Sequence, residues 1–285
     1  LQALLDDGGR NEVILPTPAW VSYQPMIELS GGRAVEVRGA MENDFRITPD
    51  QLASAITDRT AALMLNSPSN PCGTMYGPDD LAALAEVLTD HPHVAVISDE
   101  IYERLVYGPE PHRSFATLDG MADRTITVNS LSKSHAMTGW RIGYVCATMM
   151  DGRFSAAVAR LQGQMNSHIA SFAYPAIVAA LTQCDDAVEQ MRLRFAERAD
   201  LMYGFISGMP GVECPRPAGA FYVFPRIASM FGRTSPGGRV IESALDFAEA
   251  LLEDAQVAVV PGEDFGAGAE EHVRLSFACG EEQIR

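Results

Sequence analysis

Two cations lie in one short polar segment of the sequence and could do chemistry together. The segment is NSLSKSHAMTGWRIGY, residues 129–144, and it contains Lys133 and Arg141 between two apolar runs. A lysine amine can add to a carbonyl group once it has lost its proton, and burial or a neighbouring cation lowers the pKa that controls this loss. Lys133 is therefore either a solvated loop charge or a nucleophile.

Polar residues also follow other apolar runs that we predict as strands. NSPSNPCG comes after TAALML, SDEIY comes after VAVI, and Trp20 comes after VILPTPA. Each has a structural explanation on its own, since Asn-Pro is a common turn signal and an aspartate after a strand often caps the next helix. In α/β sheets, however, ligands bind at the carboxyl ends of the strands, so these segments are expected to meet in one site.

The residue types in these segments match the needs of pyridoxal phosphate. Lys133 can form the Schiff base, and a buried carboxylate at Asp99 can keep the pyridine nitrogen protonated. Tyr102 and Asn70 can donate hydrogen bonds to the ring oxygen, and Trp20 offers a flat face on which the ring can stack.

Three further residues suit the phosphate group of that cofactor. The Arg141 guanidinium is a planar fork that matches phosphate oxygens, and the hydroxyls of Ser130 and Ser132 can donate to the same group. We predict no metal site, because the five cysteines contain no CxxC pair and have no histidine nearby at ligand spacing. The five cysteines are scattered along the chain, which indicates no disulfide framework and fits a reducing cytoplasm.

Charge and hydropathy limit the class of partner. The formal net charge is −16 and the pI is near 4.7, which disfavours nucleic acid, because nucleic acid binding depends on clustered lysine and arginine. No apolar run approaches the length of a membrane span. We therefore expect a small-molecule site in a cytoplasmic protein that binds neither nucleic acid nor membrane.

Short β-branched runs alternate with helical or loop segments between residues 11 and 147. The runs are NEVILP, TAALMLN, HVAVIS, RTITVNS and RIGYVCA. Thr48-Pro49-Asp50 and Gly77-Pro78 are helix start signals. The alternation predicts an α/β fold with a mostly parallel central sheet that is covered on both faces.

The pattern later changes to long helical stretches at residues 156–183 and 187–206, and the opening LQALLDDGG also looks helical. A helix around ALDFAEALLED and the strands AQVAVVP and EHVRLSFA follow. We predict a large α/β domain at residues 1–200 and a small α+β domain at residues 201–285, each incomplete at its outer end.

Seven segments resemble fold-type I pyridoxal phosphate enzymes of the class I/II aminotransferase family, above all its bacterial aspartate aminotransferase branch. They are PTPAWVSY, ALMLNSPSNPCG, VISDEIYERLVY, TVNSLSKSHAMTGWRIGY, PAGAFYVFP, VAVVPGEDFG and HVRLSFA, in family order across nearly the whole chain. The resemblance implies a transaminase that moves an amino group from an L-amino acid to a 2-oxo acid by a ping-pong mechanism. It also implies a homodimer with active sites shared between the subunits.

The resemblance implies a role for each residue that matches a family motif. Lys133 would be the Schiff-base lysine and the general base. The cofactor-binding set would be Trp20, Asn70, Asp99, Tyr102, Ser130, Ser132, Lys133 and Arg141. Arg274 in HVRLSFA would bind the substrate α-carboxylate, with Trp20 and Asn70 beside it. Without the resemblance, a surface arginine on an edge strand would be the preferred interpretation of Arg274.

Parts of the family pattern are absent from the sequence. A phosphate-cradling loop, an N-terminal arm and a tyrosine that reaches the neighbouring subunit's cofactor would precede Leu1, and the end of the last helix would follow Arg285. We therefore expect a piece of a longer enzyme that binds the cofactor poorly by itself.

Substrate and reaction stay open at this point. Aspartate or a related amino acid is the first expectation, but the Lys133 segment also resembles that of transaminases that use arginine with pyruvate, and aromatic substrates are further candidates. The same fold supports other pyridoxal phosphate reactions, in lyases and cyclases. An aminotransferase-like domain also occurs in some transcription regulators, behind a DNA-binding domain.

Overall fold

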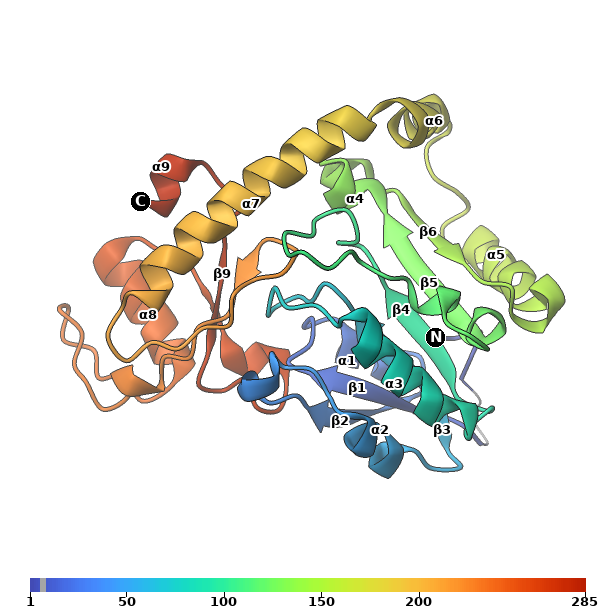
Figure 1. The fold of residues 1–285 in the computed structure, drawn as a ribbon, viewed down its shortest axis with the longest axis horizontal. Helices are drawn as coiled ribbons and strands as arrows, with labels where there is room; N and C mark the ends of the chain where they lie inside the picture. Colours follow the sequence, from blue (N-terminus) through green and yellow to red (C-terminus); the bar gives the residue numbers. More distant parts are fainter. Residues whose placement is uncertain (6–8) are drawn as a thin grey trace.

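The larger of the two β-sheets found in the described residues is formed by the N-terminal half of the chain (Figure 1). In this computed structural model, which describes residues 1–5 and 9–285, its six strands lie in the order β2-β1-β3-β4-β5-β6. The strands are β1 (Glu12–Thr17), β2 (Arg33–Arg38), β3 (Thr60–Asn66), β4 (Ala95–Asp99), β5 (Thr125–Ser130) and β6 (Gly143–Cys146). β1 to β5 are parallel and β6 pairs with β5 in the antiparallel sense, so the predicted mostly parallel α/β sheet is confirmed.

Helices cover both faces of this sheet. Neighbouring side chains of a strand point to opposite sides, and apolar side chains on both sides pack against helices. Ile14 and Leu63 pack with residues of α2 and α3 on one face, whereas Val13 and Ala62 pack with residues of α1 and α5 on the other. The α-helices of the described residues are α1 (Tyr23–Leu29), α2 (Pro49–Ala55), α3 (Pro78–Thr89), α4 (Leu131–Ser134), α5 (Arg153–Met165), α6 (Tyr174–Gln183), α7 (Asp185–Ser207), α8 (Ala244–Ala255) and α9 (Glu281–Ile284).

Two predicted helix starts are confirmed. The Thr48 side chain caps α2 by accepting a hydrogen bond from Gln51 N at 3.3 Å, and the Gln51 side chain accepts one from Thr48 N at 2.9 Å. At α3, Asp80 Oδ2 accepts a hydrogen bond from Gly77 N at 2.9 Å, and Pro78 stands in the first turn. Proline costs no hydrogen bond there, because the first amides of a helix have no acceptor within it.

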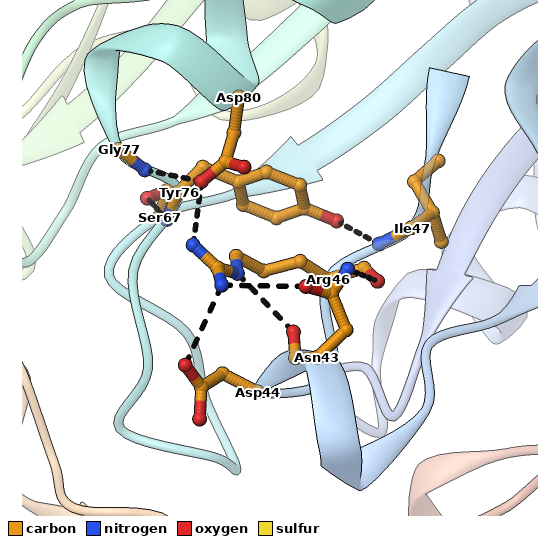
Figure 2. Close-up of polar contacts among 8 residues, drawn as sticks. All are labelled: Asn43, Asp44, Arg46, Ile47, Ser67, Tyr76, Gly77 and Asp80. Carbon is orange, nitrogen blue, oxygen red and sulfur yellow. Dashed lines mark hydrogen bonds and ion pairs between the residues drawn. The ribbon is translucent and has the colours of Figure 1, made fainter.

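A polar network ties the segment between β3 and α3 to the residues before α2 (Figure 2). Arg46 Nη1 donates to Asp80 Oδ2 at 2.6 Å, and the Tyr76 hydroxyl accepts from Ile47 N at 2.9 Å. Ser67 Oγ accepts from Tyr76 N at 3.1 Å. The network thus holds the segment NSPSNPCG, which carries one of the predicted site residues.

A three-stranded antiparallel sheet in the order β7-β9-β8 lies in the C-terminal part of the chain. Its strands are β7 (Tyr222–Val223), β8 (Val260–Pro261) and β9 (Val273–Ser276). The long helix α7 runs from the end of α6 to this sheet (Figure 1), where Met202 and Ile206 pack against Val223. The predicted boundary at residue 200 falls within α7, so the division into two domains stays a prediction.

The structure differs from several local predictions. Residues 156–183 form two helices, because Ser167 between them adopts a left-handed conformation with φ of 63°. AQVAVVP is a strand only at Val260–Pro261, since α8 continues to Ala255. The helix expected at LQALLDDGG is a turn at residues 2–4, and residues 6–8 lie outside the described ones. β2 was not predicted, because half of the residues in its sequence RAVEVR are charged and exposed.

His272 is buried beside β9, and within the described part of the chain neither of its ring nitrogens has a hydrogen-bond partner. Its ring stacks on Phe224 with the centroids 5.0 Å apart, and it meets Phe45 edge-on at 5.3 Å. Burial, and after it the charge of Arg226, lower the pKa of His272 to about 4. In the unfolded chain the same ring takes up a proton below about pH 6.5.

We predict that His272→Phe reduces the loss of stability in acid. The unfolded wild-type chain is protonated at His272 below about pH 6.5 and the folded one only near pH 4, so the folded state loses stability as the pH falls through this window. The loss is about 2 kcal/mol at pH 5. Chemical denaturation of both proteins at about pH 7.5 and pH 5 measures it, and an equal pH dependence in the two would refute this account of His272.

Candidate active site

The carboxyl ends of β3, β4 and β5 meet at one edge of the large sheet. Asn66 and Asp99 end neighbouring parallel strands and lie opposite each other in the register, and Ser130 ends β5. Asn66 Nδ2 donates to the Asp99 carbonyl oxygen at 3.0 Å, and its Oδ1 accepts from Asn70 N at 2.9 Å. The polar segments that follow these strands therefore lie together, as ligand sites of parallel sheets do.

Lys133 lies in the four-residue helix α4 rather than in the predicted loop. Ser130 caps this helix, since its hydroxyl accepts a hydrogen bond from Ser132 N at 3.0 Å. The Lys133 side chain is partly buried, and its Nζ lies 5.5 Å from the centroid of the Phe221 ring. The cap thus fixes Lys133 one turn beyond the end of a buried strand.

The pKa of the Lys133 amine is lowered, chiefly because burial disfavours the charged form. The guanidinium groups of Arg141 and Arg274 lower it further by charge repulsion. More of the amine is therefore uncharged near neutral pH than in a solvated lysine, and only the uncharged amine can add to a carbonyl. Lys133 is also the only lysine among the 285 residues.

Asp99 and Glu100 are neighbouring carboxylates with different surroundings. Asp99 Oδ2 accepts a hydrogen bond from the Tyr23 hydroxyl at 2.6 Å, and Oδ1 accepts one from Ile101 N at 3.1 Å. Burial raises the pKa of Asp99, although both hydrogen bonds oppose the rise. Glu100 Oε1 accepts hydrogen bonds from Ser98 Oγ, Ser114 Oγ and Phe115 N. The hydrogen bonds of Glu100 thus stabilise the fold. A nearby cation would stabilise the ionised form of Asp99, which burial disfavours.

Arg274 links the small sheet to the segment that follows β3. Its Nη1 donates to Asn70 Oδ1 at 2.8 Å, and its guanidinium carbon lies 4.7 Å from the centroid of the Tyr222 ring. The Tyr222 hydroxyl is 3.0 Å from that of Tyr102, and both side chains are buried. β9, which carries Arg274, is the middle strand of its sheet, so the interpretation as a surface arginine on an edge strand is wrong.

Trp20 and Arg141 are the more exposed of the predicted site residues. The Trp20 residue is 37% exposed, and its ring meets that of Tyr23 edge-on, with the centroids 5.3 Å apart. Arg141 lies in a left-handed turn, where its Nη1 donates to the Thr138 carbonyl at 3.0 Å. Ser132, by contrast, is buried in α4, and its carbonyl accepts from Thr138 Oγ1 at 2.9 Å. Trp20 and Arg141 thus keep surface that a ligand can reach.

Comparison with known proteins identifies the family of this chain. The sequence profile described as "Aminotransferase class I and II" matches residues 1–285. The chain belongs to this family. An aspartate aminotransferase of Bacillus subtilis is 42% identical to this chain over 278 residues, which are 97% of this chain and 67% of that protein.

Two further relatives agree with this assignment. An aspartate/prephenate aminotransferase of Cereibacter sphaeroides is 43% identical over 286 residues, which cover all of this chain and 70% of that protein. The crystal structure of an aspartate aminotransferase from Rhizobium meliloti matches with a TM-score of 0.92 at 39% identity, over 99% of this chain and 69% of that one. The aminotransferase chain thus spans about two thirds of the length of these relatives.

The aminotransferase depends on pyridoxal phosphate, as its homologues do, and the side chains at the sheet edge fit this cofactor. A partly buried amine with a lowered pKa, as in Lys133, suits a Schiff base. Burial disfavours the ionised carboxyl of Asp99, and a protonated ring nitrogen would stabilise that ionised form. The guanidinium groups of Arg141 and Arg274 suit one phosphate and one carboxylate.

Sequence reasoning missed Tyr23 and Tyr222, which contact the predicted residues. Tyr23 starts α1 three residues after Trp20, so its place at the carboxyl end of β1 could have been recognised from the position of Trp20. Tyr222 stands in a strand of two residues, where no periodic pattern exists to indicate which way its side chain points.

We predict that Tyr23→Phe weakens pyridoxal phosphate binding about tenfold, because it removes a hydrogen bond to a largely buried carboxylate. Without this bond the pKa of Asp99 rises further, so less of the carboxyl is ionised to hold a ring cation. Titration of the apoprotein with the cofactor, followed by absorbance, measures the Kd. Tyr203→Phe, in α7, is the control, and an unchanged Kd for Tyr23→Phe would disprove the role of this hydroxyl.

Proposed function

We propose that this aminotransferase moves the α-amino group of aspartate, or of a closely related amino acid, to a 2-oxo acid. The observation that carries the proposal is the Lys133 amine, whose pKa is lowered by burial and by two neighbouring guanidinium groups. The substrates in the names of the Bacillus subtilis and Cereibacter sphaeroides relatives support an acidic amino acid.

Lys133 would anchor the cofactor and transfer the proton. Pyridoxal phosphate, when bound, supplies a carbonyl that condenses with amines and a ring that withdraws electrons from the amino acid Cα. Lys133 would hold the cofactor through its amine and, as a free amine, would move a proton between the substrate Cα and the C4′ atom of the cofactor. Its lowered pKa would let the free amine accept that proton near neutral pH.

Other side chains would hold the cofactor in place. Asp99 would pair with the protonated pyridine nitrogen, and this pairing would offset the burial that raises the carboxyl pKa. Tyr102 and Asn70 would donate to the phenolic oxygen, and Trp20 would stack on the ring. The phosphate would be bound by Ser130, Ser132 and Arg141.

Arg274 would bind the substrate α-carboxylate. Its guanidinium is restricted by Asn70 Oδ1 on one edge and by the rings of Tyr222 and Phe265, whose centroids lie 4.7 Å and 5.2 Å from its central carbon. A fixed guanidinium suits a bidentate carboxylate. Every amino acid has this carboxylate. The role of Arg274 therefore supports an amino acid substrate but does not indicate which side chain that substrate carries.

A panel of amino donors with 2-oxoglutarate, oxaloacetate and pyruvate tests this function. We expect kcat/KM for aspartate with 2-oxoglutarate to exceed that for phenylalanine or arginine by about tenfold or more. A larger value for either of those donors would replace aspartate as the substrate. If no donor converts the holoenzyme between its aldehyde and amine forms, aminotransferase activity itself is refuted.

We predict that Lys133→Ala removes the Schiff-base absorbance and lowers kcat about a thousandfold or more, since no other lysine in this chain can replace the amine. Lys133→Arg keeps the positive charge but not the ability to lose a proton, so it should fail equally. Absorbance spectra and kcat measure both effects, with circular dichroism as the control for folding. Retention of the absorbance or the turnover would contradict the role of Lys133.

We also propose a homodimer with shared active sites. Exposed apolar side chains gather on α5, α6 and the segment between them, at Met165, Phe172, Val178 and Leu181. Surface of this kind is typical of contacts with another polypeptide. A solution mass of twice that of the chain is expected for the holoenzyme.

The cytoplasm is the compartment that we propose. All five cysteines are free, which supports a reducing environment. Within residues 1–5 and 9–285, no helix combines the length and the apolar character needed to cross a membrane.

A further inference from the structure

Tyr222 contacts two of the proposed functional groups at once. The side chain is buried in β7, with 6% of the residue surface exposed. Its hydroxyl oxygen lies 3.0 Å from that of Tyr102, and its ring centroid lies 4.7 Å from the guanidinium carbon of Arg274. Since Tyr102 is proposed to bind the cofactor and Arg274 the substrate, one side chain joins the two halves of the site.

The hydrogen bond between the two hydroxyls acquires a direction when the cofactor binds. Each phenol has one proton to donate, and in the pair by itself either oxygen can be the donor. Once Tyr102 donates to the phenolic oxygen of the cofactor, Tyr222 has to donate to Tyr102. Burial raises the pKa of both phenols, so both keep their protons at neutral pH.

Two consequences follow from this arrangement. A phenol that accepts a hydrogen bond donates a stronger one, because successive hydrogen bonds polarise each other. The Tyr222 hydroxyl would therefore strengthen the bond from Tyr102 to the cofactor. The face of the Tyr222 ring attracts the Arg274 guanidinium, which also bonds Asn70, so the ring limits the positions that this cation can take.

We propose that Tyr222 is a positioning residue of the aminotransferase: its hydroxyl strengthens the Tyr102 hydrogen bond to the cofactor, and its ring orients Arg274 for the substrate carboxylate. The inference rests on the proposed function. The two contacts use different parts of one side chain, so two substitutions separate them.

Tyr222→Phe removes the hydroxyl and keeps the ring. The visible absorbance of the holoenzyme titrates when the proton shared by the Lys133 nitrogen and the cofactor ring oxygen is lost, which leaves that oxygen negative. A weaker Tyr102 bond stabilises the negative oxygen less, so we expect the midpoint of the titration to rise by about half a pH unit. KM for the amino acid should stay within about twofold of wild type, because the ring still supports Arg274.

Tyr222→Leu removes both the hydroxyl and the ring. The titration midpoint should rise as in Tyr222→Phe, and KM for the amino acid should also rise, by about fivefold. Phenylalanine at this position would thus restore KM without restoring the midpoint. A residue that only filled space in the fold would not give this separation.

Tyr203→Phe is the control. The Tyr203 ring centroid lies 5.4 Å from the guanidinium carbon of Arg216, in another part of the chain, so this substitution should change neither the titration midpoint nor KM. A wild-type midpoint in Tyr222→Phe would overturn the role of the hydroxyl, and a wild-type KM in Tyr222→Leu would overturn the role of the ring. A wild-type holoenzyme that no amino donor converts between its aldehyde and amine forms would overturn the proposed function itself, which separates that failure from a failure of this inference.

Discussion

The site depends on the charge state of the Lys133 amine, which is set chiefly by burial and further by two guanidinium groups. Burial lowers the pKa of Lys133, and Arg141 and Arg274 lower it further. The chain as a whole carries a formal charge of −16, so these three cations form a local exception to its acidic character. Such a group attracts anions, and both the cofactor phosphate and a substrate carboxylate are anionic. The two guanidinium groups therefore add to the effect of burial on the amine, and they also attract its anionic ligands.

The fold keeps these cations together against their repulsion, and it takes them from separate parts of the chain. Lys133 is fixed by the Ser130 cap at the end of β5, whereas Arg274 comes from the middle strand of the small sheet. Asn70, in the segment that follows β3, accepts a hydrogen bond from Arg274 of the small sheet, and this segment is held by the network around Arg46 (Figure 2). The positions of Lys133 and Arg274 thus depend on the Ser130 cap and on the segment that carries Asn70.

Local patterns predicted the large sheet well, because a buried run such as TAALML and a capped start such as Thr48-Pro49 need no distant partner to be recognised. The small sheet was harder, since strands of two residues are defined by pairing with β9 and not by any periodicity. The same limit applies to the site. Tyr102 and Tyr222 are 120 residues apart in the chain, and only the fold brings their hydroxyls together. A stronger signal for Lys133 was present in the composition, since the chain has no other lysine.

Borohydride reduction of the holoenzyme, followed by mass analysis of its peptides, tests the anchoring role of Lys133 most directly. Reduction converts the carbon–nitrogen double bond to a single bond and so fixes the cofactor on the nitrogen that holds it. We expect the added phosphopyridoxyl mass on the peptide that contains Lys133. The same mass on a different residue, or no modified peptide at all, would contradict the central claim.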